Sequence, residues 1–214
     1  MSRKPSYIVR SEFGRHGQLL LQVRRPYRGQ WSKAGGGPMA TWDQVSYAFY
    51  EEGTESGSTI IGTADTQQTL TVDTNYQLRI QVDETGGGSG DLRTIDFQYN
   101  HAGAGYVDVG AATTAVQYVD STSLTNGADT TQRLDTGSFI NTNAGVTEDN
   151  TIPNLTYGAN EKCEFLLSFK IIGADVSDGD EILFRIQGCD SFTIIADADV
   201  SKPAAGGRRI FIIS

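Results

Sequence analysis

The sequence is poor in cysteine, histidine and proline, with 2 Cys, 2 His and 5 Pro among 214 residues. It also lacks a long hydrophobic run, because no window approaches the roughly 18 continuous apolar residues that a membrane helix requires. The first five residues, Met-Ser-Arg-Lys-Pro, lead into no apolar segment of the kind found in secretory signals. We therefore expect no membrane span, and we expect a protein that is made and assembled in a reducing compartment.

The few histidines give little support to catalysis or metal binding. His16 lies in a basic segment and His101 in a glycine-rich one, and neither has the spacing to other ligands that a zinc site or a catalytic triad requires. The glycine-rich segments do not follow a strand and open a helix, as a phosphate-binding loop would. The sequence predicts a protein that is not an enzyme and that needs no cofactor.

The two cysteines flank a pair of predicted strands. Cys163 and Cys189 would be misaligned for a disulfide unless Gly188 formed a bulge that shifted the strand by one residue. Without a secretion signal, two free thiols are the better interpretation.

Charge is segregated along the chain. Residues 1–40 hold eight basic residues and the single acid Glu12, a net charge of +7, and residues 201–214 carry +3. The middle, residues 41–200, has a net charge of −19, and the three segments together give the total of −9. Such segregation favours ends that contact something other than their own middle, although ends folded back onto the acidic domain are the alternative.

The middle of the chain has the pattern of an all-β domain, with alternating apolar and polar residues between turn-forming clusters. Gly35-Gly36-Gly37-Pro38 is typical of a linker. We expect an arm over residues 1–42, a sandwich domain over 43–200 and a tail over 201–214. The predicted strands are 44–51, 68–72, 76–82, 94–99, 106–109, 115–119, 162–172, 181–187 and 192–197.

The clearest local prediction is a hairpin of residues 163–171 and 182–187. The expected pairs place six apolar side chains on one face: Ile171 with Ile182, Phe169 with Phe184, and Leu167 with Ile186. That face must pack on a second sheet, which predicts a β-sandwich. The turn between the strands is acidic, with Asp175, Asp178, Asp180 and Glu181. These acids are either a calcium site or, by default, solvated turn residues.

The basic arm interleaves cations with aromatic residues but also holds the apolar run Leu19-Leu20-Leu21. A purely electrostatic contact with nucleic acid would not need that run, so a protein partner is favoured. The candidate partner-binding residues are Arg3, Lys4, Arg10, Arg15, Leu20, Arg24, Arg25, Tyr27, Arg28, Trp31, Arg208, Arg209, Phe211 and Ile213.

Three segments carry a resemblance to a known group. Residues 119–134 with the following Gly137-Ser138-Phe139 step, residues 164–185, and residues 72–99 resemble β-sandwich domains in structural proteins of tailed bacteriophages. The likeness spans about residues 43–200 and leaves 1–42 uncovered. It implies an immunoglobulin-like antiparallel sandwich in a virion component without catalytic residues, which would be assembled in the host cytoplasm. The charge pattern and the glycine-rich linker add the expectation of an extended N-terminal arm and a short C-terminal tail outside that sandwich.

These observations together predict a capsid decoration or cement protein. Its arm and tail would bind the major capsid protein or other virion subunits, with homo-oligomers in the assembly and no membrane or nucleic-acid partner. One alternative is a tail, collar or adhesion component of the virion. The other is a carbohydrate-binding module that stacks sugars on Tyr99, Tyr106 and Tyr118.

Overall fold

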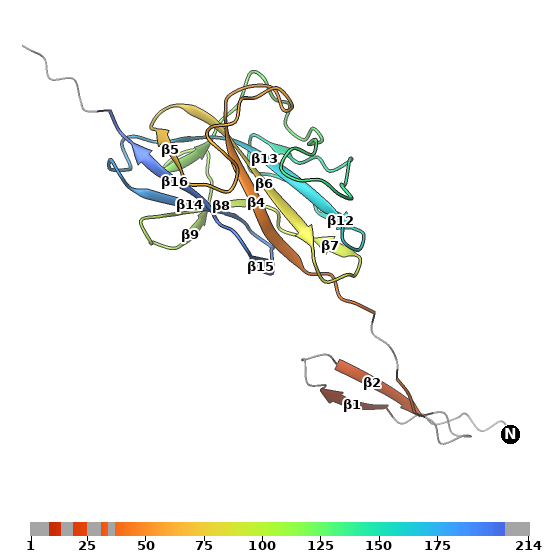
Figure 1. Ribbon diagram of the computed structural model, residues 1–214. Helices are drawn as coiled ribbons and strands as arrows, with labels where there is room; N and C mark the ends of the chain where they lie inside the picture. Colours follow the sequence, from red (N-terminus) through yellow and green to blue (C-terminus); the bar gives the residue numbers. More distant parts are fainter. Residues whose placement is uncertain (1–8, 14–18, 25–30, 34–36, 204–214) are drawn as a thin grey trace, which may run out of the picture. The chain divides into compact units, whose positions relative to one another are not determined.

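The computed structural model describes residues 9–13, 19–24, 31–33 and 37–203, with side chains from residue 37 onward. The chain divides into two compact units, residues 1–39 and the part that begins at Ala40. Regular structure in the described residues is entirely β, as expected (Figure 1).

The N-terminal unit is a three-stranded antiparallel sheet in the order β1-β2-β3. Its strands are β1 (Val9–Phe13), β2 (Leu19–Arg24) and β3 (Trp31–Lys33). The expected extended arm thus contains paired strands within residues 9–33, because its apolar runs favour a ladder over a solvated extended chain.

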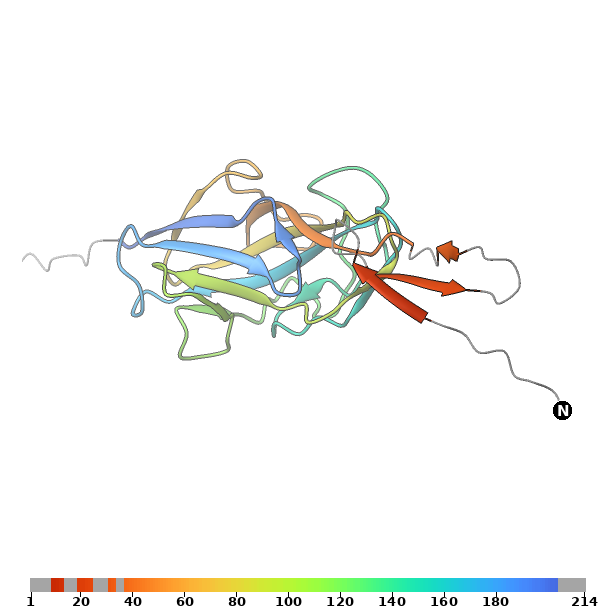
Figure 2. The same cartoon turned by 90° about the horizontal axis from the view of Figure 1, so that it is seen from below.

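The second unit is a β-sandwich of two main sheets (Figures 1 and 2). One has the order β10-β13-β6-β4-β15 with β11 beside β13, and the other has the order β5-β16-β14-β8-β9. The first sheet comprises β4 (Trp42–Glu51), β6 (Asn75–Glu84), β10 (Val116–Tyr118), β11 (Val146–Thr147), β13 (Lys162–Ile171) and β15 (Ser191–Phe192). The second comprises β5 (Gln68–Thr71), β8 (Phe97–His101), β9 (Tyr106–Asp108), β14 (Glu181–Ile186) and β16 (Ala196–Ser201). A separate pair, β7 (Gly90–Leu92) and β12 (Leu155–Tyr157), is antiparallel.

The sandwich is not purely antiparallel. β15 pairs with β4, β16 with β5 and β11 with β13 in parallel. The predicted strand over residues 192–197 is divided between β15 and β16, which belong to different sheets, so the chain changes sheets within it. Strands β7, β11 and β12, of two or three residues each, were not predicted.

An aromatic cluster joins the two sheets. The ring centroids of Phe169 on β13 and Phe184 on β14 are 5.2 Å apart, and Phe49 on β4 lies 5.9 Å from Phe184. All three side chains are fully buried. Burial of each stabilises the fold by roughly 2–3 kcal/mol, so this cluster is a major part of the core.

The predicted hairpin of residues 163–171 and 182–187 is wrong. β13 pairs instead with β6, where Phe169 lies opposite Tyr76, and β14 pairs with β8, where Phe184 lies opposite Tyr99. Phe169 and Phe184 therefore meet across the core instead of side by side in one sheet. The alternation that placed both residues on an apolar face was correct, but alternation cannot distinguish a neighbour in the sheet from a partner in the facing sheet.

We expect Phe169→Ala to lower the free energy of unfolding by about 3–5 kcal/mol, because it removes a fully buried ring at the centre of the aromatic cluster. Urea denaturation followed by tryptophan fluorescence measures this. The control is Val107→Ala, at a side chain that is 49% exposed, with an expected change within about 0.5 kcal/mol. Equal effects of the two changes would contradict the two-sheet core.

Candidate interaction surfaces

The outer faces of the two main sheets differ in exposure. On the six-stranded sheet, the residues that point away from the aromatic core are also buried, among them Gln77, Arg79, Glu164 and Ser168. Loop segments around Glu55 and Thr131 cover them. The outer face of the five-stranded sheet has no such cover and is half-exposed or exposed at most positions. We call it the open face.

The cover on the six-stranded sheet is held by one buried arginine. The guanidinium of Arg79 donates to the carboxylates of Glu164 at 2.9 Å and Glu55 at 2.6 Å, and to the carbonyl of Thr131 at 2.7 Å. Burial opposes ionisation of Glu55, but its bonds to Arg79 and Thr131 outweigh burial and lower the pKa of that carboxyl. Arg79 thus ties two loops to the strand β6.

A second arginine, Arg133, also holds these loops on the six-stranded sheet. The guanidinium of Arg133 lies 4.5 Å from the centre of the Tyr50 ring and donates to the hydroxyl of Ser58 at 3.0 Å. The backbone N–H groups of Arg133 and Leu134 donate to Glu164. Two cationic side chains of this acidic domain, Arg79 and Arg133, therefore make their contacts within the domain.

We expect Arg79→Met to lower the free energy of unfolding by about 3–5 kcal/mol, because Glu164 would remain buried without its charged partner. Thermal and urea denaturation measure the loss. Adding Glu164→Gln should recover part of it, whereas Arg93→Met, at an exposed ion pair with Asp91, should change stability by at most about 1 kcal/mol. A loss from Arg79→Met no larger than that from Arg93→Met would contradict the assigned role.

The entry of the chain into the sandwich is held by Glu84, a residue that is only 2% exposed. Burial would raise the pKa of its carboxyl, but backbone N–H donors outweigh burial and hold that pKa below its ordinary value. The carboxylate oxygens accept hydrogen bonds from the backbone N–H groups of Thr41, Gly86, Gly87, Gly88 and Asn160. Next along the chain, Trp42 and Asp190 exchange a pair of hydrogen bonds. These hydrogen bonds fix the backbone at Thr41 and Trp42, the first residues of the sandwich.

We expect Glu84→Gln to lower the free energy of unfolding by about 1–3 kcal/mol at pH 7, because a neutral amide accepts these bonds less strongly. A lowered folded-state pKa means that the stabilisation by the carboxylate is present above its unfolded-state pKa and is lost as pH falls through the folded-state pKa. The difference between the wild type and the variant should therefore shrink below about pH 4.5. Urea denaturation between pH 3 and 7 checks this, with the exposed Glu51→Gln as the control. A difference that does not change with pH would contradict the role of the ionised carboxylate.

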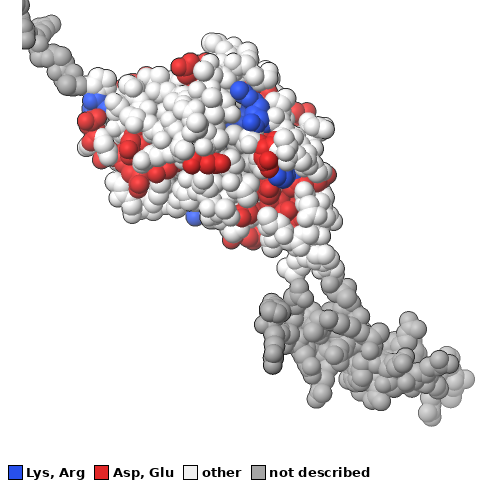
Figure 3. All heavy atoms as spheres, in the orientation of Figure 1, with Lys and Arg blue, Asp and Glu red and all other residues white. Residues whose placement is uncertain are grey.

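The open face is acidic. Glu181 on β14 is the register partner of Asp199 on β16, and Asp197 lies two residues before Asp199 on the same strand. The side-chain amide of Gln67 donates to both aspartates. The pKa of Asp197 is raised by its burial and then by the charges of Glu181 and Asp199. Within the described part of the chain, none of these three carboxylates forms an ion pair, so they leave the face negatively charged. Figure 3 shows that acidic side chains outnumber basic ones on the visible side of the domain.

Arg185, a cation on the open face, is engaged in contacts within the domain. The guanidinium of Arg185 lies 3.9 Å from the centre of the Tyr106 ring and 5.3 Å from that of Phe192. Its Nε and one terminal nitrogen donate to the side-chain oxygen of Gln98 at 2.9 and 2.8 Å. This stack fixes the arginine in place and covers the tyrosine ring.

The three tyrosines considered for sugar stacking do not form a platform. Tyr99 is 5% exposed, and its hydroxyl accepts a hydrogen bond from the N–H of Ala115. Tyr118 packs against the core, and Tyr106 lies under Arg185. The structure therefore does not bring these rings together on one exposed surface.

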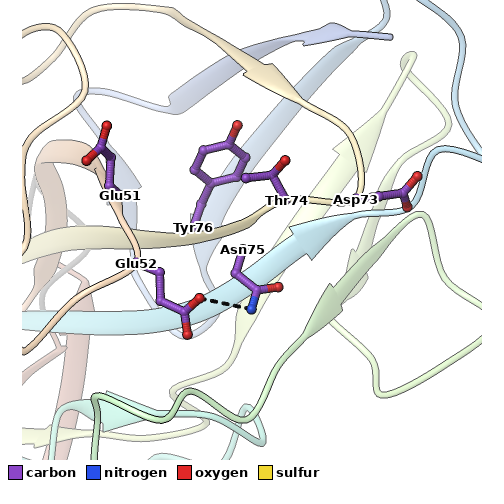
Figure 4. Close-up of a pocket in the computed structure, with 6 residues that line it drawn as sticks. All are labelled: Glu51, Glu52, Asp73, Thr74, Asn75 and Tyr76. Atoms are coloured by element: carbon purple, nitrogen blue, oxygen red, sulfur yellow. Dashed lines mark hydrogen bonds between the residues drawn. The ribbon is translucent and has the colours of Figure 1, made fainter. Parts of the chain in front are cut away.

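A pocket of about 620 Å³ lies where β4 ends and β6 begins (Figure 4). Asn75 donates to the carboxylate of Glu52 at 3.0 Å, and the hydroxyl of Tyr76 accepts the N–H of Thr71 at 2.9 Å. Its lining residues are Glu51, Glu52, Asp73, Thr74, Asn75 and Tyr76. The pocket is acidic and open, at the end of the sandwich opposite Trp42, because Trp42 and Glu51 are the two ends of β4.

The acidic turn considered for calcium is used for local structure. Asp180 accepts the N–H of Ser177 and lies 2.8 Å from Nε2 of His101, and these two contacts lower the pKa of its carboxyl. Asp178 accepts the N–H of Lys202. Within the part of the chain that the structure describes, no group of three or more His, Cys, Asp or Glu residues is placed to hold a metal ion.

Both cysteines are free thiols, which confirms that interpretation of the sequence. Burial raises the pKa of the Cys163 thiol, and burial followed by the charges of Asp43 and Asp190 raises that of Cys189 to about 12. Neither thiol is therefore ionised at neutral pH.

Four of the predicted partner-binding residues lie in the described strands of the N-terminal unit. Arg10 pairs with Gln22, Leu20 with Glu12, and Arg24 with Trp31. Because paired residues share a face and faces alternate along β2, Arg10, Leu20, Arg24 and Trp31 belong to one face of the sheet. The other ten lie outside the described residues: Arg3, Lys4, Arg15, Arg25, Tyr27, Arg28, Arg208, Arg209, Phe211 and Ile213.

Comparisons with known proteins found no matching family model, no matching curated protein and no matching solved structure. No helix long and apolar enough to cross a membrane occurs in the described ranges.

Proposed function

We propose that the chain is a structural component of a tailed-bacteriophage virion, a decoration protein whose N-terminal unit binds the head surface and whose immunoglobulin-like sandwich is displayed outward. The observation that carries this proposal is the segregation of charge between two separate compact units. Residues 1–39 carry +7, whereas residues 40–214 carry −16.

The contacts within the sandwich sharpen this contrast. Arg79 and Arg133 are used in the buried cover, and Lys162 bonds to Asp83 and Asp135. The amine of Lys202 donates to two backbone carbonyls. Positive charge available to a partner is therefore concentrated in the N-terminal unit, where it suits an acidic surface on a major capsid protein or another virion subunit.

The acidic open face supports outward display in this proposal. A face that carries uncompensated carboxylates repels polyanions and other copies of itself, which suits a surface turned to solvent and not one that packs on a neighbour. Attachment through a separate unit leaves the sandwich free of the contact. Many copies on a symmetric lattice would allow a modest contact to hold, since a tethered site gains effective concentration.

The test is co-sedimentation of the full chain with phage heads that lack it, at increasing salt. We expect Arg24→Glu with Arg25→Glu to reduce binding at least tenfold, because the pair reverses two charges of the basic unit. The matched control reverses two charges of the sandwich, Arg93→Glu with Lys170→Glu, and should bind like the wild type. Equal binding by both double variants would contradict attachment through the N-terminal unit.

Antibody labelling of intact virions in electron micrographs decides the location. Label over heads supports the decoration role, whereas label over tails would replace it with the tail or collar role. Purified virions that contain none of the chain would overturn the proposal.

A further inference from the structure

One lysine and two aspartates meet at the start of β13. The Nζ atom of Lys162 contacts Oδ2 of Asp135 and lies 3.4 Å from Oδ2 of Asp83. Lys162 is the register partner of Asp83 on β6, whereas Asp135 belongs to the loop between β10 and β11. The side chains of Lys162 and Asp83 are only 21% and 17% exposed, and that of Asp135 is 46% exposed. An amine and two carboxyl groups therefore converge in a partly buried cluster.

The backbone holds the loop of Asp135 against β13. The N–H of Lys162 donates to the carbonyl of Ser138 at 2.9 Å, and the N–H of Ile140 donates to the carbonyl of Lys162 at 3.0 Å. Gly137 lies under the lysine stem, because a Cβ added there would lie 3.3 Å from Cε of Lys162. The contact between the amine and Asp135 is thus fixed by the loop backbone as well as by the two side chains.

The two carboxyl groups of the cluster differ in their tendency to ionise. The hydrogen bond from Lys162 lowers the pKa of the Asp135 carboxyl, and the same bond raises the pKa of the amine. Burial raises the pKa of the Asp83 carboxyl and outweighs the hydrogen bond that Gln81 donates to it at 2.7 Å. Asp83 is therefore the member of the pair that binds a proton more readily, next to an ion pair of Lys162 and Asp135.

We propose that Lys162 and Asp135 condense to a covalent amide bond and that Asp83 transfers the protons. The ammonium of Lys162 first gives a proton to the carboxylate of Asp135, which leaves a neutral amine and a neutral acid. The amine nitrogen then bonds to Cγ of Asp135, Asp83 protonates the departing hydroxyl, and the nitrogen returns a proton to Asp83. One C–N bond forms, one C–O bond breaks and one water molecule is released, so no oxidant or other reactant is needed.

Fixed position favours this bond over the ion pair. Two groups held in reactive contact behave as if they were present at an effective concentration of about 10⁵ M or more, which opposes the hydrolysis that bulk water favours. The exposed side of Asp135 gives the released water a path to solvent. The bond would close a covalent ring over residues 135–162 and fasten the loop to β13. It does not depend on the virion proposal, which stands or falls by binding to heads.

The intact mass of the denatured full chain tests the bond. We expect the wild type to weigh 18 Da less than the sum of its residues, about 23.1 kDa. Lys162→Arg keeps the charge but should show the full mass, and Asp83→Asn should contain at most a tenth of the linked form. Lys170→Arg, on the same strand, is the control and should lose 18 Da like the wild type. A wild type of full mass, or a loss of 18 Da that persists in Lys162→Arg, would overturn the inference.

Trypsin then locates the bond in the wild-type chain, so this test does not require any variant to fold. Neither Lys nor Arg occurs between Leu134 and Lys162, and the unlinked chain therefore yields the fragment 134–162. Trypsin does not cut after a lysine whose amine is bonded, so the expected product is the fragment 134–170, lighter by 18 Da. Fragmentation should place the link between Asp135 and Lys162. A link from Lys162 to Asp83 would contradict the roles assigned to the two aspartates.

Discussion

The contact between the rings of Phe169 and Phe184 is the interaction on which the sandwich depends. Each ring belongs to an inner strand of its sheet, β13 between β10 and β6, and β14 between β16 and β8. Nine residues, 172–180, connect β13 to β14. The contact between the two rings therefore sets the distance between the sheets close to a short covalent connection. The side chain of Gln44 then bridges the sheets, donating to the carbonyl of Phe184 and accepting the N–H of Ile186.

Each sheet has an inner face in the core and an outer face, and the outer faces of the two sheets differ. The six-stranded sheet buries charge there, and a buried arginine is tolerated only because carboxylates and carbonyls satisfy it, which draws the loops onto the sheet. The five-stranded sheet keeps Arg185 at the surface, where aromatic rings and one amide are enough. One sheet therefore has a structural outer layer, and the other has a surface that a partner or solvent can reach.

The sequence predicted the positions of strands better than it predicted which strands pair with each other in a sheet. Alternation placed the residues of β13 and β14 on the core correctly, because side-chain period is a local property. It could not assign their partners, since a short connection suits a hairpin and a crossing between sheets equally. Glu84 and Arg79 had no local signal at all, because their partners Thr41 and Glu164 lie 43 and 85 residues away along the chain. In the N-terminal unit, the apolar run Leu19-Leu20-Leu21 was interpreted as part of a contact with a partner, although an apolar run preceded by Gly14 and Gly17 also fits a strand after a hairpin turn.

Side chains also alternate between two faces in the sheet of the N-terminal unit. In the sandwich, a sheet with an apolar face finds its second layer within the same chain. In the N-terminal unit, the described strands β1, β2 and β3 form one sheet. The segregation of charge by sequence position, +7 in residues 1–39 against −16 in residues 40–214, is only half of the pattern. Within the basic unit the register also separates charge by face, so that Leu20 shares a face with Arg10 and Arg24 while its neighbour Leu21 belongs to the uncharged one.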